Sequence, residues 1–220
     1  MNILHIDSSA LGGASVSRQI TAEVVHAIQA RSPKAGVQYR DLSAKPLSHL
    51  SGELLAGLRP APGTSAAPSE EIRAELAEAE EVLTEFLAAD VIVVGAPMYN
   101  FSVPSQLKSW IDRIAQAGRT FRYTANGPEG LAGGRKVIVV SSRGGILAGQ
   151  AHEAALDHQE AYLRTVFNFI GITDVSVVRA EGIGYGPEAR DAAIAKALER
   201  AQFVGEEVSE ECAGKEAVAA

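Results

Sequence analysis

The sequence is poor in the residues that mark several protein classes. It has one cysteine in 220 residues, Cys212, which excludes an internal disulfide and a cysteine metal site. Its five histidines show no ligand spacing, so no metal site is predicted. Asp and Glu (27) outnumber Lys and Arg (20), and the net charge of −7 argues against nucleic-acid and anionic-membrane surfaces. No apolar run approaches the ~18 residues of a membrane span.

The chain also lacks the basic and apolar regions of a signal peptide. A strand pattern begins almost at once, at Ile3, so we expect a cytoplasmic protein. With 46% hydrophobic residues, the chain can bury a full core as one α/β domain. We expect this domain to cover residues 1–208 and to be followed by an acidic, Ala-rich tail over residues 209–220.

Apolar β-rich runs alternate with amphipathic segments, which is the pattern of a parallel sheet covered by helices. It predicts a three-layer α/β sandwich, with five strands in the order 2-1-3-4-5 and helices on both faces. The expected strands are residues 2–6, 37–41, 91–95, 137–141 and 174–179. The expected helices are near residues 16–31, 69–88, 104–117, 151–170 and 187–208.

Two connections are longer than this pattern requires, and long loops are usually functional or mobile. Residues 42–68 include a flexible run at 60–64. Residues 118–135 carry Phe121, Tyr123 and several glycines, which suits a lid.

Serines and glycines surround the start of the first helix. Ser9 follows the first strand, and Ser15, Val16 and Ser17 open the helix. Free N–H groups, the helix dipole and serine hydroxyls favour a phosphate there. An ordinary Ser N-cap with a flexible turn is the alternative. A Walker lysine and the dinucleotide GxGxxG spacing are both missing.

Unusual side chains follow the third strand. Four β-branched residues, 91–94, indicate a strand buried on both faces, and the loop after it holds Pro97, Met98, Tyr99, Asn100 and Phe101. Ligands of open α/β sheets bind at this edge. The alternative is a hydrophobic connection that only covers the edge.

The fourth strand ends in Ser142, Arg143, Gly144 and Gly145. Adjacent glycines let a backbone lie close to a ring system and offer N–H groups to it. An ordinary strand-to-helix turn is the alternative here. Taken together, the three loops converge at neighbouring strands, and a phosphate cradle, an aromatic wall and a Gly-rich ring contact describe an FMN site.

With these residues, the chain resembles the FMN-dependent NADH-azoreductases, which are also quinone reductases, of the flavodoxin-like fold. The resemblance covers nearly the whole chain. It depends on residues 15–17, 96–101, 120–123, 142–145 and 169–175.

The resemblance implies a role for each loop. Ser9 and residues 15–17 would hold the FMN phosphate, residues 97–101 the ring and ribityl chain, and residues 142–145 the pyrimidine edge. Asn100, Phe121, Tyr123 and Phe169 would line the acceptor pocket. The resemblance further implies a homodimer with its sites at the subunit interface.

The expected reaction is two-electron transfer by a ping-pong mechanism. NADH or NADPH would reduce tightly held, non-covalent FMN at N5, and a quinone or an aromatic azo compound would then be reduced. No catalytic side chain is assigned. The alternatives are a flavodoxin-like electron carrier and a regulatory FMN-binding protein without nicotinamide-dependent turnover. His5 and Asp7 lie on the first strand and are expected to be core residues.

Overall fold

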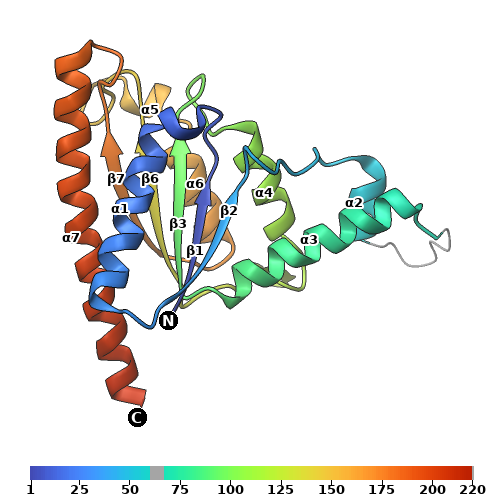
Figure 1. Cartoon of the computed structure of the whole chain (residues 1–220). Coiled ribbons are helices and arrows are strands. Elements are labelled where there is room, and N and C mark those ends of the chain that lie inside the picture. Colours follow the sequence, from blue (N-terminus) through green and yellow to red (C-terminus); the bar gives the residue numbers. More distant parts are fainter. Residues whose placement is uncertain (60–66, 220) are drawn as a thin grey trace.

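The five predicted strands form one parallel sheet in the computed structural model of the protein (Figure 1). The structure describes residues 1–59 and 67–219, and only the backbone of 213–219, so the run at 60–64 lies outside it. The sheet order is β2-β1-β3-β6-β7, which confirms the predicted order because these are its first to fifth strands along the chain. The strands are β1 (Asn2–Asp7), β2 (Gly36–Asp41), β3 (Val91–Pro97), β6 (Lys136–Ser142) and β7 (Asp174–Ala180).

Three helices begin at serine side chains that accept a free N–H group of the first turn. Ser15, Ser51 and Ser69 cap α1, α2 and α3 through their side-chain oxygens. The single helix expected near 151–170 is divided in two, because Asp157 Oδ1 accepts the N–H groups of Gln159 and Glu160 and starts α6 anew. The helical elements are η1 (Gly12–Ala14), α1 (Val16–Arg31), α2 (Gly52–Leu58), α3 (Glu70–Ala88), α4 (Ser105–Ile114), α5 (Glu153–Leu156), α6 (Glu160–Phe169) and α7 (Pro187–Ala219).

Alternate residues of the central strands fall into two hydrophobic clusters. On β1, Leu4 and Ile6 pack with side chains of α3, α4 and α6. Ile3, next to Leu4 in the strand, packs with side chains of α1 and α7. Because neighbouring side chains of a strand point to opposite faces, the two clusters lie on opposite faces of the sheet. Along the described chain, no helix combines the length and the hydropathy that crossing a bilayer requires.

Helix α7 is longer than the sequence pattern indicated. It continues to Ala219, so the expected boundary between residues 208 and 209 lies inside a helix. Ser209 Oγ donates to Ile28 O, and Glu211 pairs with Lys136 at 2.7 Å. The tail therefore begins as part of the packed domain. Gly205 of α7 extends this contact, because it packs so closely against α1 that a Cβ would stand 2.5 Å from that of Ala27.

The connection at residues 118–135 is a hairpin and is not a lid over the loops of its own chain. Its strands are β4 (Phe121–Thr124) and β5 (Gly127–Gly130), which pair antiparallel. The hairpin packs beside the loop that enters β7, where Ala132 N donates to Ile170 O at 2.8 Å. It therefore lies at the amino ends of β6 and β7, away from the loops at the carboxyl ends in its own chain, and its role as a lid stays a prediction.

Candidate functional site

The loop after β1 carries buried hydroxyl groups at the start of α1. Ser9, Ser15 and Ser17 are all nearly inaccessible. Ser15 Oγ accepts the N–H of Arg18 and lies 3.1 Å from Ser17 Oγ. The N–H groups of Val16 and Ser17 have no acceptor within the helix, because the first turn of an α-helix leaves its donors free. These donors could hold an anion at the start of α1.

The loop after β3 contains two strained residues. Asn100 and Phe101 both have positive φ, at 49° and 69°, the only such non-glycine residues in the described chain. They are the central residues of a tight turn closed by hydrogen bonds between Tyr99 and Ser102 in both directions. Positive φ is costly for a bulky residue, and such strain concentrates at functional sites. The turn presents the half-exposed ring of Phe101 to solvent.

Hydrogen bonds join the three loops to one another. Ser9 Oγ lies 3.1 Å from the Tyr99 hydroxyl, which also accepts the Ala10 N–H. Met98 N donates to Ser142 O at 2.8 Å. The structure therefore brings together the three loops that the sequence placed at the carboxyl edge of the sheet.

The loop after β6 is held by a second loop, which follows β7. Gly182 N donates to Gly145 O and Gly184 N donates to Gly144 O, at 2.9 and 3.0 Å. The exposed side chain of Tyr185 lies beside Gly145. The only sequence signal for this support was the glycines on both sides of Tyr185.

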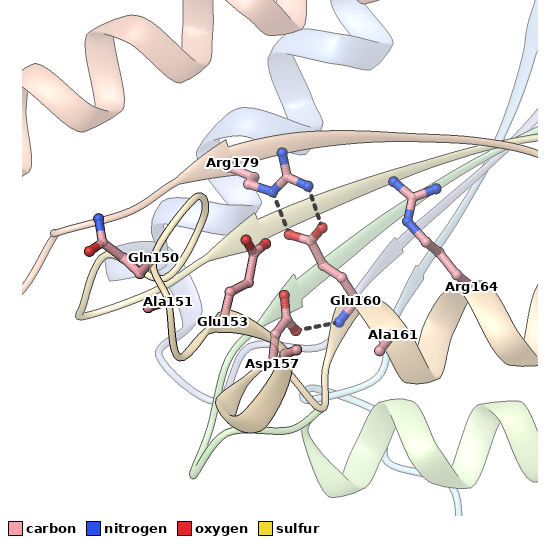
Figure 2. A pocket seen from close by; sticks show the side chains of 9 residues that line it. Gln150, Ala151, Glu153, Asp157, Glu160, Ala161, Arg164 and Arg179 are labelled. Carbon is pink, nitrogen blue, oxygen red and sulfur yellow. Dashed lines mark hydrogen bonds and ion pairs between the residues drawn. The ribbon is translucent and has the colours of Figure 1, made fainter.

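The side chain of Arg143 does not point to solvent at this loop. It is 1% exposed and contacts Asp157, Glu160 and Glu181. Figure 2 shows the open pocket next to this cluster, where Arg179 donates two hydrogen bonds to Glu160. The pocket has a volume of about 510 Å³. Arg143 therefore reaches the predicted cofactor region through its backbone, while its guanidinium is engaged inside the protein.

A second buried charge lies under the first loop. Asp7 is 1% exposed and accepts hydrogen bonds from Thr21 and Tyr39. Burial by itself would raise the pKa of Asp7, but the nearby His5 ring and these two hydroxyls outweigh it and hold the pKa below its usual value. Burial and the Asp7 carboxylate raise the pKa of Tyr39 to about 12. His5 and Asp7 thus belong to a packed polar cluster, although His5 Nε2 makes no hydrogen bond within the described residues.

The predicted acceptor pocket is not assembled within one chain. Phe121 contacts Tyr123 and Phe169, with ring centroids 5.6 and 4.6 Å apart. These rings lie with the hairpin at the amino edge of the sheet, whereas Asn100 lies at the carboxyl edge. A seven-residue strand such as β6 separates the two edges by about 20 Å.

The residues of the three loops fit FMN in their donor chemistry and in the space beside them. Serine hydroxyls and free helix N–H groups suit a phosphate. A Cβ placed on Gly12, Gly13 or Gly144 would meet no protein atom within 4 Å, so the space beside these glycines is open to a ligand. The side chains of the Asn100–Phe101 turn supply an amide and a ring for a planar group.

The sheet order and the converging loops define a protein of the flavodoxin-like class. A family model described as "Flavodoxin-like fold" matches residues 1–203. The chain is 58% identical over 199 residues to an FMN-dependent NADH:quinone oxidoreductase of Azospirillum brasilense, covering 90% of this chain and 94% of the relative.

The chain belongs to the family of the FMN-dependent NADH:quinone oxidoreductases and azoreductases. Among solved structures, an azoreductase from Bacillus anthracis has a TM-score of 0.85 and 27% identity, covering 94% of this chain and 99% of that one. An FMN-dependent NADH-azoreductase from the same species, in complex with FMN, has a TM-score of 0.86. At 24% identity over 94% of this chain and 99% of that one, it supports the fold alone.

Proposed function

We propose that this protein is an FMN-dependent oxidoreductase that transfers two electrons from NADH or NADPH to quinones and reductively cleaves aromatic azo compounds. The observation that carries the proposal is the direct hydrogen bonding between the loops after β1, β3 and β6, through Tyr99 and Met98. The name of the Azospirillum brasilense relative supports the same activity.

The protein would bind and orient the reactants, and bound FMN would supply the two-electron chemistry that no side chain here offers. Ser15, Ser17 and the first N–H groups of α1 would hold the phosphate. Backbone N–H groups at Gly144 and Gly145 would donate to the pyrimidine edge and stabilise negative charge there. A ping-pong mechanism follows if donor and acceptor occupy the same surface in turn.

Two copies of the chain would be needed to complete the acceptor pocket. Tyr123 is 75% exposed and Phe169 36% exposed at the amino edge, too far from the loops of their own chain. In a homodimer, the aromatic cluster of one protomer would cover the loops of its partner. This arrangement accounts for exposed aromatic side chains that cover nothing in a single chain.

Anaerobic stopped-flow absorbance of the FMN-loaded protein tests the reaction. We expect full bleaching of the flavin by NADH or NADPH, followed by rapid reoxidation with a benzoquinone or an azo dye. A flavin that binds but is bleached by neither nicotinamide would overturn the enzyme and favour the electron carrier or the regulatory protein.

Mixed dimers test the shared pocket. Chains with Ser15→Ala and Ser17→Ala would be combined with chains carrying Tyr123→Ala and Phe169→Ala. Each variant alone should lose most activity, whereas the mixed dimer should regain up to one active site of two. A monomer in light scattering, or mixtures without recovery, would contradict the dimeric site.

A further inference from the structure

Arg143 is the centre of a buried polar network at the carboxyl edge of the sheet. Its guanidinium contacts Asp157 and Glu160, and Nη1 lies 3.3 Å from Glu181 Oε1. Nε donates to Ser141 Oγ at 3.0 Å and to Gln159 Oε1 at 3.2 Å. A buried guanidinium with this many partners has one fixed position.

The network reaches both loops that are proposed to hold the flavin ring. Gln159 Nε2 donates to Ala96 O, directly before the Pro97–Phe101 loop. Glu181 Oε1 accepts the N–H groups of Leu147 and Ala148, two and three residues after Gly145. The side chain of one arginine thus connects the loop after β3 with the loop after β6.

Electrostatics gives the network a second consequence. Arg143 and Arg179 contribute two positive charges, and Asp157, Glu160 and Glu181 contribute three negative ones. The cluster therefore carries a net charge of −1 with Arg143 and −2 without it. Such charges are only weakly screened, because Arg143, Asp157 and Glu160 are buried.

Packing alone does not require these charges. Replacing a buried ion pair by apolar residues of similar volume is often neutral or stabilising. A positively charged group beside a redox site has an electrostatic use. Without it, the site carries extra negative charge, which opposes the charge that reduction adds to the ring.

The geometry points to Arg143 as a positioning residue that fixes the two ring-holding loops and, by its charge, raises the reduction potential of bound FMN. This inference rests on the proposed function, since it concerns the same site. It assigns the guanidinium an indirect role, while the resemblance implied only that residues 142–145 hold the pyrimidine edge.

The test measures FMN affinity in both oxidation states and the midpoint potential of the bound flavin. Arg143→Met keeps an unbranched apolar stem and removes the charge, and we expect the ratio of the reduced to the oxidised Kd to rise about tenfold, which equals about 30 mV for two electrons. Arg143→Lys keeps the charge, so its ratio of the reduced to the oxidised Kd should stay within about threefold of the wild-type ratio.

Glu181→Gln provides a second variant that keeps the acceptor oxygen but removes a negative charge. It should raise the potential, which means that the ratio of the reduced to the oxidised Kd falls several-fold. Arg31→Met, which breaks an exposed pair with Glu206 on the far part of α1 and α7, is the control and should not shift the potential.

The outcomes separate this inference from the proposed function. Unshifted potentials, or shifts of the same sign in Arg143→Met and Glu181→Gln, would overturn the inference alone. If Arg143→Met fails to fold, an unshifted Glu181→Gln potential overturns it and an upward shift supports it. A wild-type protein that retains no FMN would overturn the proposed function and this inference together.

Discussion

The two edges of the sheet differ in their polarity and in how tightly the chain packs there. At the carboxyl edge, buried hydroxyls and charges lie beside a turn with two strained residues, Asn100 and Phe101. At the amino edge, the hairpin closes over apolar side chains and the backbones of Gly130 and Gly171 nearly touch. The carboxyl edge keeps polar groups available for a ligand, whereas the amino edge is closed by the chain itself.

The largest expected effect tests the closed edge. A Cβ on Gly130 would stand 2.2 Å from Gly171 N, so Gly130→Ala must displace backbone. We expect a loss of about 3 kcal/mol in the free energy of unfolding. Gly52→Ala, where a Cβ meets nothing within 4 Å, is the control, and urea unfolding should show no loss or a small gain in stability. Equal stabilities would show that the hairpin tolerates a looser approach.

The next effect tests the open edge with two serines that cap helices in the same way. Ser15→Ala and Ser69→Ala should each cost about 1 kcal/mol of stability, since both side chains accept an N–H at 3.2 Å. Only Ser15→Ala should also weaken FMN binding, by about 10- to 100-fold, because a hydrogen bond to a charged group is worth about 1.5–3 kcal/mol. Fluorescence titration with FMN measures the binding, and equal FMN affinities of the two variants would refute the phosphate site at Ser15.

A third prediction concerns strain. Phe101 and Phe203 are nearly equally exposed, at 51% and 52%, but only Phe101 has positive φ. Phe101→Gly should stabilise the FMN-free protein by about 0.5–1 kcal/mol by relieving strain. Phe203→Gly should destabilise it by about 1 kcal/mol, because glycine weakens a helix. Thermal unfolding compares them, and shifts of the same sign would refute strain at Phe101.

The smallest effect concerns ionisation at the carboxyl edge. Asp7→Asn should lower the pKa of Tyr39 from about 12 toward its usual value by about one unit. Tyr39 stabilises the fold below pH 10 and loses this contribution as the pH rises toward 12, because its pKa is raised. Asp7 has a lowered pKa, so its contribution is full above pH 3.8 and is lost as the pH falls below that value.

Absorbance at alkaline pH follows the tyrosine titration, with Tyr39→Phe as the reference for the other tyrosines. Stability against acid measures the Asp7 contribution, which the asparagine variant should lack. An unchanged Tyr39 titration would mean that burial alone raises its pKa.

Much of this molecule follows from local sequence patterns. Apolar runs mark the strands of the sheet, and those of β3 and β6 are continuous because these strands are buried on both faces. Serines before amphipathic runs mark three helix starts. The convergence of the three loops also follows, since parallel strands bring their carboxyl ends to one edge.

Tertiary structure decided what local patterns do not encode. The hairpin at Phe121–Gly130 is held by close packing against Gly171, a contact between segments 41 residues apart in sequence. The extension of α7 to Ala219 depends on the contacts of Ser209 and Glu211 with distant residues, since helix propensity alone sets no end there. Local sequence patterns likewise do not indicate that the Arg143 side chain is buried. Its guanidinium is buried where Asp157 and Glu160, at the start of α6, meet Glu181, after β7, and that convergence exists only in the folded chain.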